Sequence, residues 1–241
     1  MIRAAYFDAA GTLFDSREPI GRSYSRIARE YGVDASENAV AARFRQVFHA
    51  AEGLAFGPGH SPPEIRRLER AWWRDRVAAT FETLGKFRDF EAYFEALFAY
   101  FADPAHWQVF PEASATLDRL KDRGLKLGVI SNFDHRLYRI LDGLDLTRHF
   151  DSISISSEVG YAKPRPEIFS AALGRLGVEA RDAIHIGDSE HLDYAAAQAA
   201  GIAAVLVDRA REPGKPLIEA RRAKIASLAQ VIEVTQVFGT A

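Results

Sequence analysis

The 241-residue chain has no cysteine, a single methionine and few lysines. Without cysteine it can form neither disulfides nor thiolate metal sites, and it has no cysteine nucleophile. No apolar run approaches the roughly 18 residues that a membrane-spanning helix needs. The amino terminus begins with a strand-like run rather than a basic and apolar leader. We therefore expect a cytoplasmic protein with no membrane partner.

An excess of charge of one sign is also missing, because 31 Lys and Arg stand against 33 Asp and Glu. The resulting net charge of −2 gives no overall field that would attract nucleic acid, so we expect no nucleic-acid partner. With 48% hydrophobic residues, the chain is long enough for one large domain or two modest ones. A monomer is the default expectation.

The order of the predicted elements indicates the fold class. An apolar run at 2–8 predicts a buried strand, and residues 9–16 predict a turn. After residue 105 strands alternate with single helices, as is typical of a doubly wound parallel α/β sheet. The later strands are predicted over 125–130, 152–156, 183–186 and 202–207, and the helices between them over 111–123, 134–142, 166–176 and 190–200. Residues 209–216, which include Pro213, predict a loop before a short helix and a possible edge strand.

Residues 17–104 show helical periodicity and no clear strand. Because this unit separates the first strand from the others, we expect a helical cap of residues 17–104 inserted into a core of residues 1–16 and 105–241. Aromatic residues such as Trp72 and Trp73 recur there at helical spacing. They are expected to form the core of the cap rather than a cofactor site.

Four polar segments lie at the ends of predicted strands or in the loops that follow them. They are Asp8-Ala-Ala-Gly-Thr12, Ser131-Asn132, Lys163-Pro164 and Gly187-Asp188-Ser-Glu-His-Leu-Asp193. Together they supply what phosphoryl transfer through an aspartyl intermediate needs: a carboxylate nucleophile, hydroxyl and amide donors, a lysine, and further carboxylates for Mg²⁺. Taken singly, each segment also fits an ordinary turn, helix lead-in or helix cap.

In this order the four segments resemble the haloacid dehalogenase superfamily of hydrolases, and the helical unit resembles its C1 cap. The resemblance implies a Rossmann-like core and Mg²⁺-dependent hydrolysis of a small phosphorylated metabolite. It implies that Asp8 is the nucleophile and that Lys163 orients it and offsets charge. Thr12, Ser131 and the amide of Asn132 would bind the phosphoryl group.

The same resemblance implies a set of Mg²⁺ ligands. Asp8, the backbone carbonyl of Ala10 and Asp188 would ligate the ion directly, and Asp193 would do so directly or through water. Position 10 departs from the family pattern, because phosphatases of the superfamily usually carry a second Asp there. That Asp protonates the leaving oxygen and later deprotonates the attacking water, which a methyl group cannot do.

A positioned acid or base is worth roughly 10²–10⁴ in rate, so we expect slow hydrolysis unless another group substitutes for the missing Asp. The sequence offers candidates without choosing among them. They are Asp15, Asp134, His135, Glu158, His49 and His60.

Three alternatives stay open at this point. A metal-independent 2-haloacid dehalogenase also lacks the second Asp, although members of that branch with this opening carry Ser at the position of Asp188. A phosphonoacetaldehyde hydrolase carries Ala at the position of Ala10, but it needs a lysine early in the cap. The only lysine in the predicted cap, Lys86, comes late in its sequence. The third alternative is a catalytically weak protein that binds a phosphate ligand or a partner.

Overall fold

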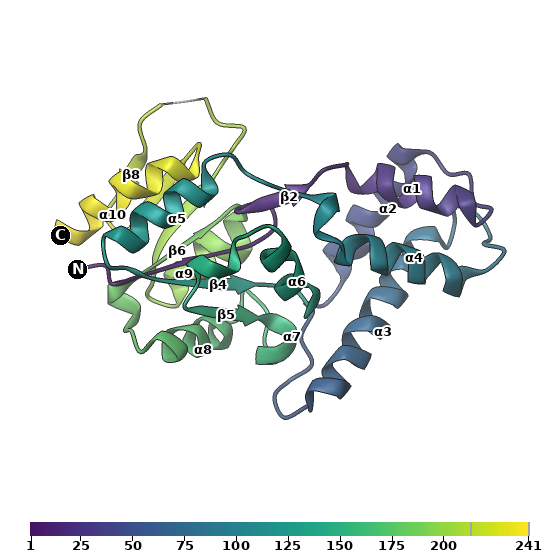
Figure 1. Cartoon of the computed structure of the whole chain (residues 1–241), viewed down its shortest axis with the longest axis horizontal. Helices are drawn as coiled ribbons and strands as arrows, with labels where there is room; N and C mark the ends of the chain where they lie inside the picture. Colours follow the sequence, from purple (N-terminus) through teal and green to yellow (C-terminus); the bar gives the residue numbers. More distant parts are fainter. Residues whose placement is uncertain (213, 241) are drawn as a thin grey trace.

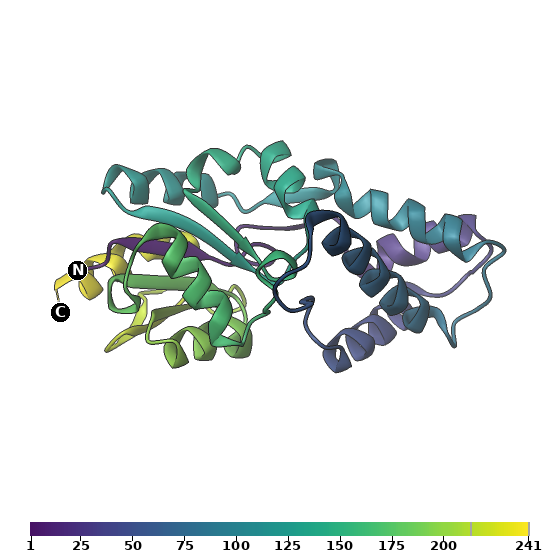
Figure 2. The same cartoon turned by 90° about the horizontal axis from the view of Figure 1, so that it is seen from below.

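The computed structural model describes residues 1–212 and 214–240, so the predictions that include Pro213 and Ala241 fall outside the described residues at those two positions. Figure 1 shows a part built on a seven-stranded sheet and, beside it, a bundle of helices. The amino terminus and the last described residues before 241 lie at the side of the sheet that faces away from the bundle (Figures 1 and 2). The predicted fold class, a doubly wound parallel sheet with a helical insertion, is confirmed.

The sheet has the strand order β5-β4-β1-β6-β7-β9-β8, and every pair is parallel except β8 with β9. Its strands are β1 (Ala4–Phe7), β4 (Lys126–Ser131), β5 (Ser152–Ile155), β6 (Ala183–Gly187), β7 (Ala203–Val207), β8 (Leu217–Glu219) and β9 (Arg222–Ile225). The chain runs from β1 outward to β4 and β5, and then returns to the other side of β1 with β6. Ligands of open α/β sheets bind where the strand order reverses in this way, outside the carboxyl ends of the strands.

Helices cover both faces of the sheet. They are α5 (Ala113–Asp122), α6 (Arg136–Gly143), α7 (Ser156–Val159), α8 (Pro166–Leu176), α9 (Ala196–Ala199) and α10 (Val231–Thr240). On one face Ala5 and Phe7 of β1 belong to the apolar cluster that includes α5, α6 and α10. On the other face Ala4 and Tyr6 belong to the cluster that includes α8 and α9. All four side chains of β1 are fully buried. The strand that precedes Asp8 is therefore held firmly in the core.

The inserted bundle consists of α1 (Ile20–Glu30), α2 (Glu37–Ala50), α3 (Pro62–Phe81) and α4 (Phe90–Ala102). The described residues of 17–104 contain no strand, as predicted. The helices pack around an apolar cluster of their own that includes Tyr24, Phe81 and Tyr93. The expected aromatic core is therefore confirmed. The division into a cap of residues 17–104 and a core of residues 1–16 and 105–241 stays a prediction.

The two crossings between the sheet and the bundle differ from the prediction. The turn predicted over 9–16 ends in a strand, β2 (Phe14–Ser16), which pairs antiparallel with β3 (Trp107–Val109). Each strand has only three residues, and the whole helical insertion separates the two in sequence. A strand of three residues is too short to show an alternation of apolar and polar residues in the sequence, so the prediction of a turn over 9–16 missed it.

The carboxyl-terminal region also departs from its prediction. The strands β8 and β9 form a hairpin at the sheet edge, and a 3₁₀ turn (Leu228–Gln230) and α10 follow them. The predicted edge strand is present, but the helix follows it instead of preceding it. No helix in the described residues is long and apolar enough to cross a membrane.

Candidate active site

The carboxyl ends of β4, β1 and β6 bring the predicted site residues together. Asp8 follows β1, Ser131 ends β4 and Asp188 follows β6, while Lys163 reaches the same edge from the loop before α8. The pocket at this edge is lined by Asp8, Ala10, Ser131, Asn132, Phe133, Lys163, Asp188, Ser189, Leu192 and Asp193. Of the predicted site residues, Thr12 is the one that is not in this lining.

Lys163 is buried and bridges two carboxylates. Its Nζ donates to Asp8 Oδ1 at 2.7 Å and to Asp193 Oδ1 at 2.5 Å. Burial alone would lower the pKa of Lys163, but the charges of Asp193 and Asp8 outweigh burial and raise it, so the ammonium stays protonated. The side-chain amide of Asn132 donates to the Lys163 carbonyl at 2.9 Å and accepts its N–H at 2.7 Å. Asn132 therefore positions the lysine, a role that the sequence did not indicate.

Three carboxylates share this space. Oxygens of Asp8, Asp188 and Asp193 all lie within 4.8 Å of one another. Burial raises the pKa of Asp8 despite the opposing charge of Lys163, and burial together with the charges of Asp8 and Asp193 raises the pKa of Asp188 to about 6. When all are ionised, three carboxylates and one ammonium leave a charge of −2. Because hard divalent cations prefer oxygen ligands, the set fits a divalent metal ion.

His185 is a site residue that the sequence analysis missed. Its Nε2 lies 2.9 Å from Asp193 Oδ1, and the Ser189 N–H donates to Asp193 Oδ2 at 3.1 Å. Burial alone would raise the pKa of Asp193, but Lys163 and His185 together hold it below its usual range. Asp193 is thus fixed as an anion. A histidine within the otherwise apolar strand β6 was the signal that could have found it.

The turn that carries Asp193 is wound differently from the predicted helix over 190–200. A π-helical turn runs over Glu190–Ala195, and the α-helical part of the predicted range is α9, which follows this turn. The hydroxyl of Ser189 caps this turn by accepting the N–H of Leu192 at 3.1 Å. Such turns occur often at functional sites, where the extra residue re-aims a side chain. Here the turn directs Asp193 toward Lys163.

Thr12 lies beside the cluster rather than in the pocket. It is fully buried, and its hydroxyl donates to Asp188 Oδ1 at 3.2 Å. In this structure it orients a predicted metal ligand, and its contact with a phosphoryl group stays a prediction. Gly11 has φ +86°, and a Cβ at this position would lie 2.5 Å from Asp188 Oδ2. Only glycine combines this backbone conformation with the approach of Asp188.

Two of the candidates for the missing acid bind the inserted bundle. Asp134 is fully buried, accepts from Arg136 Nη2 at 2.6 Å and accepts from Trp73 Nε1 of α3 at 2.5 Å. His135 bonds through its ring and its backbone N–H to Glu69 of α3. Neither lines the pocket that holds the predicted site residues. Both instead join the sheet-bearing part to α3.

The remaining candidates are also absent from the pocket lining. Glu158 accepts a hydrogen bond from the Tyr138 hydroxyl at 2.8 Å, and His60 bonds to the carbonyl of Phe56 at 2.9 Å. His49 is exposed on α2, and Asp15 lines a neighbouring cavity. Among the residues that the structure describes, none of the six candidates therefore lines the pocket beside Ala10.

Comparison with known proteins agrees with this geometry. A profile of haloacid dehalogenase-like hydrolases matches residues 2–201. Haloacid dehalogenase-like hydrolase domain-containing protein 3 of Bos taurus is 38% identical over 223 residues, which cover 90% of this chain and 86% of that protein. Glyceraldehyde 3-phosphate phosphatase of Methanopyrus kandleri is 30% identical over 217 residues, which cover 88% of this chain and 86% of that protein.

A solved structure extends the similarity to the complete fold. The crystal structure of 2-haloacid dehalogenase from Pseudomonas syringae matches with a TM-score of 0.66 and 25% identity, and covers 99% of this chain and 100% of that one. The family resemblance read from the four polar segments is thereby confirmed. This chain belongs to the haloacid dehalogenase-like hydrolases.

Proposed function

We propose that the protein is a Mg²⁺-dependent phosphatase that hydrolyses a small phosphomonoester through an aspartyl phosphate on Asp8. The observation that carries the proposal is the cluster of Asp8, Asp188 and Asp193, with oxygens within 4.8 Å and Lys163 between two of them. An anionic phosphoryl group would be repelled by this cluster unless a divalent cation joined it. When bound, Mg²⁺ supplies that neutralisation and polarises the phosphoryl oxygens.

The residues of the chain divide the chemistry among them. Lys163 holds Asp8 in place as an anion, and an oxygen of Asp8 attacks phosphorus. Ser131 lies at the end of β4 in the pocket lining, where its hydroxyl can donate to a phosphoryl oxygen. The ester oxygen leaves with the electron pair of its bond to phosphorus. Water then attacks phosphorus, the bond to Asp8 breaks, and inorganic phosphate is released.

The methyl group of Ala10 lines the pocket and cannot protonate the leaving oxygen. Turnover should therefore depend strongly on how well the leaving group departs as an anion. Acyl and aryl phosphates should react faster than alkyl phosphates by a factor that reflects the absent acid, roughly 10²–10⁴. A small phosphorylated molecule thus remains the proposed partner, and the expectations of a monomer, of no nucleic-acid partner and of a cytoplasmic location stay predictions.

The other branches of chemistry fit the site less well. A haloacid substrate brings its own carboxylate, which would meet Asp188 in a cluster that is already negative. The Schiff-base alternative needs a lysine in the site. Lys86, however, is exposed between α3 and α4 and is absent from the linings of the pocket and of the neighbouring cavity.

The test is phosphate release from acetyl phosphate and p-nitrophenyl phosphate with Mg²⁺ or with EDTA. We expect turnover that EDTA suppresses and that Asp8→Asn abolishes. Asp142→Asn, which removes an exposed carboxylate of α6, is the matched control and should retain full activity. Activity that survives both EDTA and Asp8→Asn, or release of chloride from L-2-chloropropionate without metal, would overturn the proposal.

A further inference from the structure

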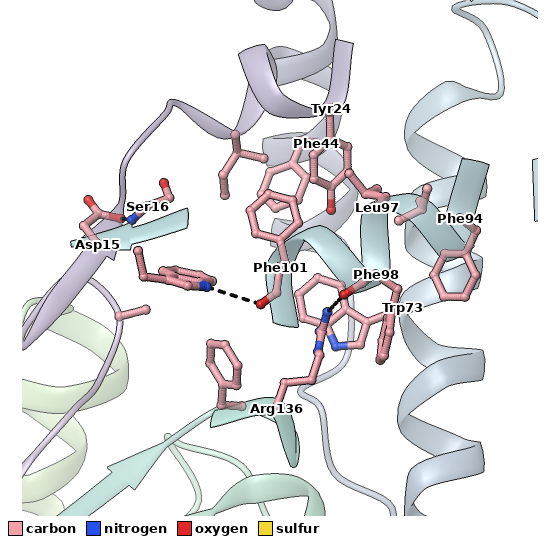
Figure 3. Close-up of a pocket in the computed structure, with 15 residues that line it drawn as sticks. Asp15, Ser16, Tyr24, Phe44, Trp73, Phe94, Leu97, Phe98, Phe101 and Arg136 are labelled. Carbon is pink, nitrogen blue, oxygen red and sulfur yellow. Dashed lines mark hydrogen bonds between the residues drawn. The ribbon is translucent and has the colours of Figure 1, made fainter. Parts of the chain in front are cut away.

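A second cavity adjoins the catalytic pocket, between the sheet-bearing part and the inserted bundle. It is partly open, has a volume of about 180 Å³ and shares Ala10 and Phe133 with the pocket. Figure 3 shows aromatic side chains directed into it from α1, α2, α3 and α4. Rings in its wall include those of Tyr24, Phe44, Trp73, Phe98, Phe101 and Trp107. A molecule held in both spaces would pass directly over the methyl group of Ala10.

The charged side chains of this wall are already engaged. The guanidinium of Arg136 donates through Nε and Nη2 to Asp134 and through Nη1 to the Phe98 carbonyl. It also lies 3.9 Å from the centroid of the Phe98 ring. Asp15 is exposed on β2, apart from the ring cluster in Figure 3, and Oδ1 of this residue accepts the Ser16 N–H at 2.7 Å. Among the described residues, the wall therefore offers a ligand a mainly apolar surface, with the hydroxyls of Tyr24 and Ser16 as polar groups and no unpaired buried charge.

The size of the cavity limits what it can hold. An apolar cavity of about 150 Å³ stays dry and binds benzene. At about 180 Å³, this cavity has room for one aromatic ring with a small substituent. A sugar or an amino acid would place several hydroxyl or charged groups mostly against rings, where little of their desolvation would be compensated.

We propose that the substrate class is the phosphate monoester of a small, uncharged phenol, with the ring in this cavity and the phosphoryl group in the catalytic pocket. The inference rests on the proposed phosphatase function and specifies its substrate. A second observation points the same way, because Ala10 supplies no proton to the leaving oxygen. Phenols ionise with a pKa of about 10, as tyrosine does, whereas water and simple alcohols ionise near about 16. A phenolate therefore leaves without the acid that an alkoxide requires.

The step balances with the groups named. An oxygen of Asp8 forms a bond to phosphorus while the bond from phosphorus to the phenolic oxygen breaks. Its electron pair stays on the phenolate, which takes a proton from solvent. Water then bonds to phosphorus, the bond to Asp8 breaks, and the proton of the attacking water passes to solvent.

Binding of inert analogues tests the cavity apart from leaving-group chemistry. Phenylphosphonate and methylphosphonate carry the same anionic group and differ in the ring. With saturating Mg²⁺, titration calorimetry should give a Kd for phenylphosphonate at least tenfold below that for methylphosphonate, because the ring loses its contact with water. Equal Kd values would overturn the inference while leaving the phosphatase proposal intact.

A variant connects this preference to the cavity. Ile20, half-buried at the first position of α1, lines the cavity, and Ile20→Trp should fill it. The Kd ratio should fall below threefold in Ile20→Trp and stay near the wild-type value in the control Ile20→Leu. A cooperative urea unfolding transition in both variants reports that they are folded. A ratio that is unchanged in a folded Ile20→Trp would place the ring elsewhere and refute the assignment.

Kinetics separate an uncharged phenol from a charged one. Phenyl phosphate and O-phosphotyrosine share the aryl leaving group, but the amino acid adds two charges. We expect kcat/KM to be at least tenfold higher for phenyl phosphate. Equal values would exclude the uncharged class, and failure to hydrolyse acetyl phosphate would instead refute the phosphatase proposal itself.

Discussion

Replacing Lys163 by methionine should reveal how strongly the site depends on one buried cation. Lys163 is 3% exposed, and its ammonium contacts Asp8 and Asp193 at 2.7 and 2.5 Å. Removing one partner of a buried ion pair costs about 3–5 kcal/mol, because it leaves a buried charge uncompensated. For a chain of this size that corresponds to a fall in melting temperature of roughly 6–20 °C. Activity should fall together with stability, since Asp8 loses the group that holds it.

The loss should depend on pH in a defined direction. In the wild type the pKa of Asp193 is depressed, so its contribution to stability is present above the unfolded pKa of about 3.9 and is lost as the pH falls through the folded pKa. In Lys163→Met the carboxylates lose the cation, their pKa values rise, and they take up protons more readily in the folded state than in the unfolded chain. The difference in unfolding free energy between wild type and variant should therefore be larger at pH 8 than at pH 5.

Urea unfolding at the two pH values, without metal, is the measurement. Lys126→Met is the matched control, because Lys126 belongs to the same sheet but donates to the Leu176 carbonyl, at 2.7 Å, instead of to a carboxylate. It should cost less than about 1.5 kcal/mol, as for a single neutral acceptor, and show little pH dependence. A Lys163→Met loss below about 1 kcal/mol, or one that is the same at both pH values, would refute the reasoning that the cation compensates buried carboxylates.

Three further predictions concern the same edge of the sheet. Ala10→Asp should restore an acid and raise kcat/KM for alkyl phosphates by about 10² or more, with a smaller gain for aryl phosphates; equal gains would mean that proton donation was not what was missing. Because the pKa of Asp188 is about 6, protons should compete with the metal for this carboxylate. The Kd for Mg²⁺, measured by calorimetry, should be constant above pH 7 and rise below pH 6. A Kd that does not change with pH would show that Asp188 is not a ligand. Gly11→Ala should weaken Mg²⁺ binding and lower the free energy of unfolding by about 1–2 kcal/mol. The control is Gly124→Ala, where φ is +79° but a Cβ would meet no atom within 4 Å, so this variant should show the backbone strain alone. Identical Mg²⁺ affinity in both variants would contradict the contact with Asp188.

The parts of the fold that could be predicted are those whose signal is local. The apolar run at 125–130 predicted a strand that the structure shows at Lys126–Ser131. The helical periodicity over 17–104 predicted a helical unit, which the structure shows as the four helices α1 to α4. The paired strands β2 and β3 could not be predicted, because their stability comes from a partner across the whole insertion rather than from their own three residues. Periodicity likewise cannot separate a π-helical turn from the first turn of an α-helix.

The candidate site shows the same limit. Asp8 and Asp188 could be found because each directly follows a strand, where chemistry-bearing side chains of parallel sheets converge. Lys163 and Asp193 lie further along the connecting segments and were found by their place in the order of the four polar segments. The roles of His185 and Asn132 could not be found, since a buried histidine in a strand and an amide in a loop have many ordinary functions.

Aromatic residues of the bundle such as Phe81 and Tyr93 were correctly predicted as core. The sequence, however, carries no sign that Trp73 and its neighbours leave a space beside Ala10.

The pairing of β2 with β3 has a consequence for how this architecture can vary. Ser16 and Trp107, which flank the insertion, are directly opposite each other in that ribbon. The segment between them thus begins and ends at a single point on the molecule, as an insertion between the two strands of a hairpin would. Its length, helix number and lining can change without altering the register of the seven-stranded sheet. The insertion can therefore be exchanged or resized as a unit, while substitutions at the strand ends act on the predicted site residues.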